Sequence, residues 1–199
     1  NPLNGLCEKV CIQTEKIFDA GIVQTRIENY SVVPASFLPA SPTYPLTFLS
    51  ARSLSCEGIV SDLNVERQPD GQYARIQAKI TIPIEIVYLD ANGQEGKALG
   101  SIVLNEDVLM FVPPASVMPF TVSAIASCVS PEGRWDPVSN SFILSACLTV
   151  ILKVSMQVEI LVPSYGYCAI PPAQEYSQEV CTGFFELPLY PQGRTPGQR

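Results

Sequence analysis

Two long stretches of this 199-residue chain alternate between apolar and polar side chains. The even positions are apolar from 74 to 88, and the same period of two continues from 142 to 162. Successive side chains of a β-strand point to opposite faces, so this period predicts long strands with one buried face. No stretch shows the 3.6-residue period of an amphipathic helix. The sequence therefore predicts an all-β fold.

Turn-forming residues separate the predicted strands. A Pro-Asp-Gly turn at 69–71 precedes the strand 73–89, and an Asp-Ala-Asn-Gly turn at 90–93 follows it. Glycine permits positive φ and proline fixes φ, which is what tight turns require. The other expected strands are 12–17, 26–33, 46–51, 58–67, 98–112 and 117–129. Successive hairpins of this kind predict an antiparallel two-sheet sandwich with a jelly-roll-like arrangement.

Two terminal segments lie outside the predicted sandwich, which takes residues 12–162. The N-terminal arm, 1–11, carries two cysteines. The C-terminal tail, 163–199, contains prolines at 163, 171, 172, 188, 191 and 196. Because proline cannot donate to a strand ladder, we expect an extended, irregular tail.

The composition excludes several classes of function. The chain has no histidine, which removes Ser-His-Asp and Cys-His catalytic groups and imidazole ligands for zinc. Its 12 basic residues are scattered over a chain of net charge −7, so nucleic-acid binding is not expected. The apolar run at 142–162 contains Lys153, Gln157 and Glu159, so no membrane span is expected. We expect neither an enzyme nor a protein that binds a metal or cofactor.

The cysteines are candidates for covalent contacts between copies of the chain. Their number is seven, so at least one has no partner within the chain. In an extended arm Cys7 and Cys11 would lie about 13 Å apart, whereas a disulfide needs Cα atoms within about 7 Å. Each therefore needs another partner, on this chain or the next. The candidate cross-linking residues are Cys7, Cys11, Cys147, Cys168 and Cys181.

Two alternatives remain for these cysteines. Buried free thiols behave as small apolar side chains, and this interpretation suits Cys128 best because apolar positions precede it. Cys147, in contrast, lies on the polar face of 142–162 and is expected to be accessible. A zinc site is the other alternative, although the spacings C-x3-C and C-x12-C do not match the C-x2-C pairs of structural zinc sites.

Trp135 is the candidate contact residue for a glycan. It lies in a stretch, 131–137, that we expect to form a loop because it contains Pro131, Gly133 and Pro137. Exposed aromatic rings can stack on the face of a sugar. The alternative, which we favour, is that Trp135 anchors the loop by packing on its own domain.

Short motifs resemble those of spore-surface proteins, of the coat, exosporium or appendage type, in clostridia and related spore formers. Residues 10–19, V-C-I-Q-T-E-K-I-F-D, resemble their openings, in which a cysteine precedes E-K-I/V-F/Y-D. Residues 82–93, I-P-I-E-I-V-Y-L-D-A-N-G, are similar to the V-P-V-x-V-x-Y-x-D-x-x-G hairpin of coat and SPOCS-type β domains. Residues 163–168 and 178–181 are similar to segments of small cysteine-bearing proteins of that group. The chain departs from the pattern at Gly21, where a further cysteine is expected.

This resemblance implies a structural role, with subunits assembled into fibres or sheets and cross-linked through cysteine. The composition agrees, because only 16% of residues are charged, against roughly 25% in typical soluble domains. We therefore expect a self-assembling homopolymer at the cell or spore surface, held by strand addition and intersubunit disulfides. Its partners would be copies of itself and other surface proteins. The alternative is a monomeric carbohydrate-binding or adhesin-type module that uses Trp135.

Overall fold

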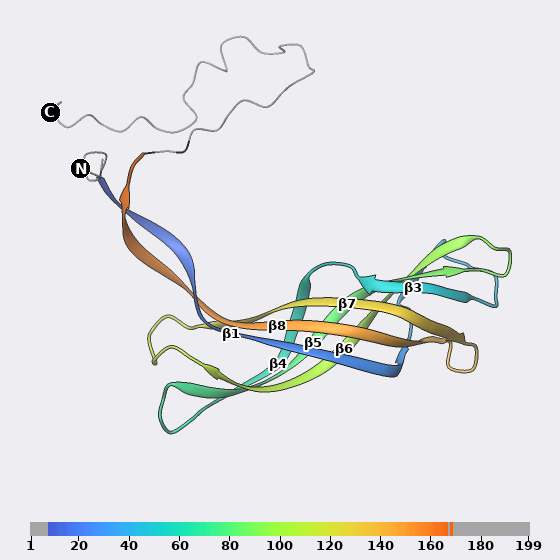
Figure 1. Ribbon diagram of the computed structural model, residues 1–199, viewed down its shortest axis with the longest axis horizontal. Coiled ribbons are helices and arrows are strands. Elements are labelled where there is room, and N and C mark those ends of the chain that lie inside the picture. Colours follow the sequence, from blue (N-terminus) through green and yellow to red (C-terminus); the bar gives the residue numbers. More distant parts are fainter. Residues whose placement is uncertain (1–7, 167, 169–199) are drawn as a thin grey trace, which may run out of the picture. The chain divides into compact units, whose positions relative to one another are not determined.

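The computed structural model describes residues 8–166 and residue 168 (Figure 1). Strands make up 75% of this part of the chain and helices none, which confirms the all-β prediction. The chain divides into two units, one being Gln13–Val158 and the other combining Asn1–Ile12 with Glu159–Arg199. The strands are β1 (Glu8–Val32), β2 (Ser36–Leu38), β3 (Thr47–Ser53), β4 (Glu57–Arg67), β5 (Tyr73–Leu89), β6 (Glu95–Phe111), β7 (Thr121–Asp136) and β8 (Ser141–Ser164).

These strands form one continuous sheet with the order β1-β8-β7-β3-β5-β6-β2. Every strand pair with an assigned register is antiparallel. β3 and β4 pair with successive parts of β5, residues 84–89 and 74–81, and both also pair with β7. The break between β3 and β4 lies opposite Pro83, whose carbonyl accepts a hydrogen bond of 2.9 Å from the Leu54 amide. Pro83 has no N–H to offer a partner there, so the ladder is interrupted where the sequence places a proline.

The core consists of the two apolar faces that the sequence predicts. Every even-numbered side chain of β5 from Ala74 to Tyr88 is buried, and so is every one of β8 from Phe142 to Val154. The two faces meet at Tyr88 and Phe142, whose ring centroids lie 6.1 Å apart. Each fully buried Ile or Leu contributes about 1.5–3 kcal/mol through the removal of apolar surface from water.

The structure corrects the expected loop at 131–137. β7 continues through this stretch to Asp136 and stays paired with β8, with a register shift between Val129 and Glu132. The shift falls at Pro131, where a β-bulge removes the need for the missing N–H. The buried Ser130 hydroxyl lies 2.9 and 2.8 Å from the carbonyl oxygens of Glu132 and Ser145, and its one proton is shared between them, which ties the bulge to both strands.

Two further differences concern the N-terminal half and the termini. The expected strands 12–17 and 26–33 are parts of one long strand, β1, and the short strand β2 was not expected. β1 begins at Glu8, the first described residue, and β8 ends at Ser164, so strands extend into both the expected arm and the expected tail. Most of the expected arm and tail, 1–7, 167 and 169–199, lies outside the described residues, and their boundaries stay a prediction.

Candidate assembly surfaces

The ends of β1 and β8 form a two-stranded ribbon, Glu8–Ile12 beside Glu159–Ser164, which we call the terminal ribbon (Figure 1). β7, the neighbour of β8 on its other side, begins at Thr121 and pairs with β8 only as far as Ser155. Residues 159–164 of β8 therefore lie beyond the end of β7. β1 is the last strand in the sheet order. Within the described chain, therefore, neither outer edge of the terminal ribbon has a neighbouring strand. An isolated two-stranded ribbon is only marginally stable in water.

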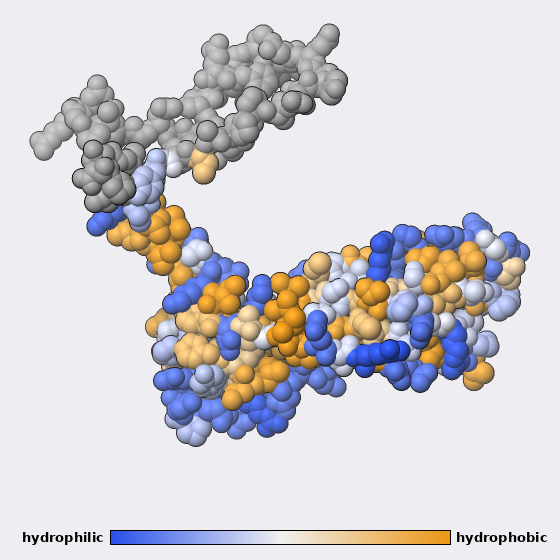
Figure 2. Space-filling view, in the orientation of Figure 1, coloured by the Kyte–Doolittle hydropathy of each residue, from blue (hydrophilic) through white to orange (hydrophobic). Residues whose placement is uncertain are grey.

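Apolar side chains and a thiol are exposed on this ribbon. Ile12 is 40% exposed, Ile160 42% and Leu161 66%, and apolar residues are visible there in orange in Figure 2. The thiol of Cys11, which directly precedes Ile12 in β1, is exposed and free. The terminal ribbon thus offers open backbone edges, apolar contact area and a group that can form a disulfide.

The other cysteines are dispersed over the structure. Cys147 is exposed on β8, as its place on the polar face predicted, and Cys168 is exposed beyond the end of this strand. Cys128 is buried, also as predicted, and burial together with the neighbouring Cys147 raises the pKa of its thiol to about 11. A thiol with so high a pKa forms little thiolate and is unreactive near neutral pH.

No two cysteines of the described chain lie at disulfide distance. Cys7 and Cys181 lie outside the described residues, so their part in cross-linking stays a prediction. Cys56, which was not among the predicted cross-linking residues, is exposed in the connection between β3 and β4. Its position between two strands, followed by Glu57 and Gly58, was the signal that could have marked it as accessible.

The second open edge of the sheet belongs to β6. β2 pairs with β6 only through Lys97, Ala98 and Leu99, so the remainder of this side has no neighbouring strand among the described residues. Side chains of β1 occupy part of it. The Val103 amide donates to the Tyr30 hydroxyl at 3.0 Å, and the Phe111 amide donates to Asp19 Oδ2 at 2.7 Å. The edge of β6 is therefore partly capped by side chains.

Glu106 adds a charge to the inner side of this edge. It pairs in register with Ala78, which is buried, and so shares the inner face of the sheet. Burial raises the pKa of the Glu106 carboxyl. An inward-pointing charge on an edge strand is one of the devices that prevent another strand from adding there.

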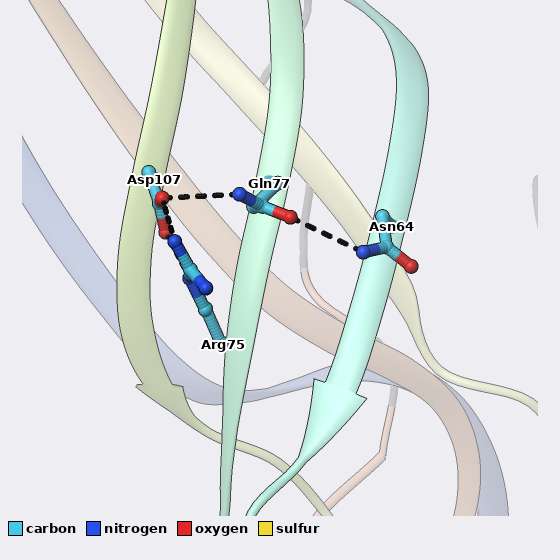
Figure 3. A network of polar contacts seen from close by, with 4 residues as sticks. All are labelled: Asn64, Arg75, Gln77 and Asp107. Carbon is cyan, nitrogen blue, oxygen red and sulfur yellow. Dashed lines mark hydrogen bonds and ion pairs between the residues drawn. The ribbon is translucent and has the colours of Figure 1, made fainter.

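A row of polar side chains crosses the outer face of β4, β5 and β6 (Figure 3). Asn64 donates to Gln77 at 3.2 Å, and Gln77 donates to Asp107 at 3.1 Å. Arg75 holds both oxygens of Asp107, at 2.8 and 2.6 Å. The hydrogen bonds from Arg75 are the main reason that the pKa of Asp107 is lowered. These groups satisfy one another, which is typical of cross-strand stabilisation on a solvated face.

Trp135 lies near the end of β7, directly opposite Phe142 of β8. The two ring centroids are 4.9 Å apart, and the rings of Phe37 and Tyr44 lie 6.4 and 5.5 Å from Trp135. The indole is half-buried and packs on its own domain. A glycan contact at Trp135 stays a prediction.

The described residues show neither a metal-binding group nor a membrane-spanning helix. The part of the chain that the structure describes contains no group of acidic, cysteine or histidine side chains suited to a metal ion. It also contains no helix that is long and apolar enough to cross a membrane. No family model, curated protein or solved structure matches this chain. The resemblance to spore-surface proteins therefore stays an expectation, and a function must be argued from the surfaces themselves.

Proposed function

We propose that this chain is a self-assembling structural subunit of an extracellular or spore-surface fibre or layer. Its body would be a jelly-roll-like sandwich in which β3 and β4 join two layers. Copies would be held together by strand addition and intersubunit disulfides. The observation that supports this most strongly is the terminal ribbon, whose two edges lack neighbouring strands in the described chain.

Strand addition would remove the weakness of the terminal ribbon. A strand from a second copy would pair with the open edge of β1 or of β8 and satisfy the backbone groups there. It would also cover Ile160 and Leu161, which are exposed in the single chain. A contact that joins different surfaces on two copies repeats without closing and generates a filament.

Disulfides would then make the contact permanent. Two thiols, such as Cys11 of one copy and Cys147 or Cys168 of the next, form one S–S bond and release two protons and two electrons. An external oxidant such as glutathione disulfide accepts them and is reduced to two thiols. Such bonds persist in oxidising compartments, which include the cell surface. Cys11 is the first candidate because it lies on the terminal ribbon and is exposed.

Negative-stain microscopy, together with non-reducing and reducing gels, tests this proposal. We expect filaments or sheets, and a ladder of covalent oligomers that collapses on reduction. Cys11→Ser should remove much of the ladder, whereas Cys56→Ser, an exposed cysteine away from the terminal ribbon, should leave it unchanged. Leu161→Lys should weaken assembly because it places a charge on the ribbon, whereas Val138→Lys in the β7–β8 turn should not.

A monodisperse monomer without assemblies, in both redox conditions, would refute the structural role. The monomeric alternative would then be tested by glycan binding and its loss on Trp135→Ala.

A further inference from the structure

The loop between β6 and β7, residues 112–120, displays two apolar side chains to solvent. Val117 is 100% exposed and Met118 59% exposed. Prolines stand at 113, 114 and 119, so few backbone conformations are open to this loop. We call Val117 and Met118 the loop tip.

Contacts from neighbouring elements hold this loop in place. Arg67 Nη2 donates to the Pro113 carbonyl at 2.8 Å, and the Arg67 guanidinium carbon lies 5.8 Å from the centre of the Phe120 ring. The Ser116 hydroxyl donates to the Met118 carbonyl at 2.8 Å, across the tip itself. A loop that is already ordered loses little conformational entropy when it binds. The loop therefore holds its exposed apolar tip in a fixed conformation, which favours insertion into a partner.

An apolar hollow of about 290 Å³ lies between β1 and β6. An engineered cavity of about 150 Å³ accepts a benzene molecule, so this hollow has room for aliphatic side chains. Its lining includes Asp19, Gly21, Ile22, Leu109 and Leu152. Ile22 and Leu109 on its rim are 63% and 62% exposed, whereas Leu152 is buried. Gly21 leaves part of this space open, because no atom lies within 4 Å of the position that a Cβ would take there.

The charges beside these two surfaces are opposite. Among the described residues, Arg67 forms no ion pair, although it donates a hydrogen bond to the loop at Pro113. Asp19, which lines the hollow, forms no ion pair in this part of the chain either. Its two oxygens accept from the amides of Ala20 and Phe111, at 2.8 and 2.7 Å. A cation at the base of the loop, where Arg67 contacts Pro113 and Phe120, therefore matches in sign an anion, Asp19, that lines the hollow.

We infer that the loop tip of one copy inserts into the β1–β6 hollow of a second copy. The inference rests on the proposed function in that copies of the chain associate, and it adds a contact separate from the terminal ribbon. The edge of β6 is capped by Tyr30 and Asp19, so it suits inserted side chains better than a whole added strand. The loop and the hollow are different surfaces, so the contact leaves one of each free for the next copy.

An anionic membrane is a less fitting partner for the loop tip. Residues 112–120 contain no Lys or Arg, and the whole chain carries a net charge of −7. Insertion into a membrane surface is strengthened by basic residues near the inserted apolar side chains. A complementary hollow on the same chain supports a second copy instead.

Two variants test the two sides of the contact separately. Val117→Asp places a charge on the loop tip, and Gly21→Phe fills the hollow from a position with open space around it. Val138→Asp, at a 91% exposed valine in another turn, is the matched control. Sedimentation velocity is run with reductant and with every chain carrying Leu161→Lys, so that neither disulfides nor strand addition at the terminal ribbon contributes. We expect each test variant to weaken association about tenfold or more, and the control to leave it unchanged.

Mixing the two variants gives the sharpest result. Val117→Asp keeps an intact hollow and Gly21→Phe keeps an intact loop tip, so the mixture should form 1:1 complexes although neither variant associates alone. These complexes should stop at two subunits, because the remaining surfaces are both defective. Circular dichroism of each variant checks that the fold is retained.

Several outcomes would overturn the inference. They are unchanged association of both folded variants, absence of the 1:1 complex in the mixture, and Val117-dependent binding to phosphatidylserine vesicles by a chain that stays monomeric. The proposed function fails separately. If the 1:1 complex forms but no filaments or sheets appear under any condition, the inference stands and the structural role is wrong. If filaments form equally well with both variants, only the inference is wrong.

Discussion

Replacing Tyr88 by phenylalanine is expected to stabilise the fold, although most substitutions in a core destabilise it. Tyr88 is 0% exposed, and its hydroxyl has no hydrogen-bond partner. Gly96 lies directly opposite in β6, and a Cβ there would be 2.5 Å from the hydroxyl oxygen. The phenol thus fits only because residue 96 has no side chain. The space that glycine leaves holds the hydroxyl but offers it no hydrogen-bond partner.

The magnitude follows from the cost of burying an unpaired hydroxyl. Protein mutational data put this cost at about 1–3 kcal/mol. Phenylalanine keeps the ring contacts with Phe37 and Phe142, whose centroids lie 5.8 and 6.1 Å from that of Tyr88. It loses only the contacts of one oxygen atom. We therefore expect the free energy of unfolding to rise by about 1 kcal/mol in Tyr88→Phe.

The effect also depends on pH, with a defined sign. Burial, followed by the nearby Tyr44 and Asp90, raises the pKa of Tyr88 above its ordinary value of 10.0. Above pH 10 the unfolded chain releases this proton while the folded chain retains it, so the wild type loses stability as the pH rises further. Tyr88→Phe has no such proton, and its advantage should grow above pH 10.

Urea unfolding followed by circular dichroism measures the difference. The midpoint concentration should rise in Tyr88→Phe while the slope stays the same, which marks a change in stability alone. Tyr73→Phe, at a 41% exposed tyrosine of the same strand, should leave the midpoint nearly unchanged. A lower midpoint for Tyr88→Phe at pH 7, with an unchanged slope, would refute the reasoning.

Two further substitutions test the packing and charge of β6. Gly96→Ala should cost about 1–3 kcal/mol, because its Cβ would collide with the Tyr88 ring, and urea unfolding should show this beside a nearly neutral Gly21→Ala. Glu106→Gln should raise stability at pH 7 but not at pH 4. Burial raises the pKa of this carboxyl above 4.5, so the stability present at low pH is lost as the pH rises through the folded-state pKa. Equal midpoints for Glu106→Gln and wild type at pH 7 would contradict this.

The sequence predicts the parts of this fold that local pattern determines. β5 occupies the predicted range, 73–89, because strict alternation runs between two turns whose residues fix its ends. The range of β8 is predictable from the same alternation, and only its outermost residues extend beyond the predicted 142–162. Pro83 is also predictable as an interruption, because the missing N–H is a property of the residue itself.

Long-range pairing determines the parts that the sequence did not predict. Pro131 and Gly133 favour a loop, but pairing with β8 and the hydrogen bonds of Ser130 extend β7 through both. The β1–β6 hollow leaves no local trace, because its lining comes from three strands, β1, β6 and β8, that are far apart in the sequence. Gly21 is conspicuous in the sequence only as an isolated glycine within a strand, which signals a bulge or a close approach as readily as an open space.

The contrast between the two exposed edges determines where a strand can be added. Exposed edges invite pairing with other chains, and folded proteins usually shorten, charge or cover them. β2 is only three residues long, and the remaining edge of β6 has side-chain caps from β1 and the inward-facing Glu106. The terminal ribbon has none of this protection in its central residues, where Ile160 and Leu161 are exposed on β8. This difference in protection is why we propose strand addition at the terminal ribbon and the insertion of side chains, not of a strand, beside β6.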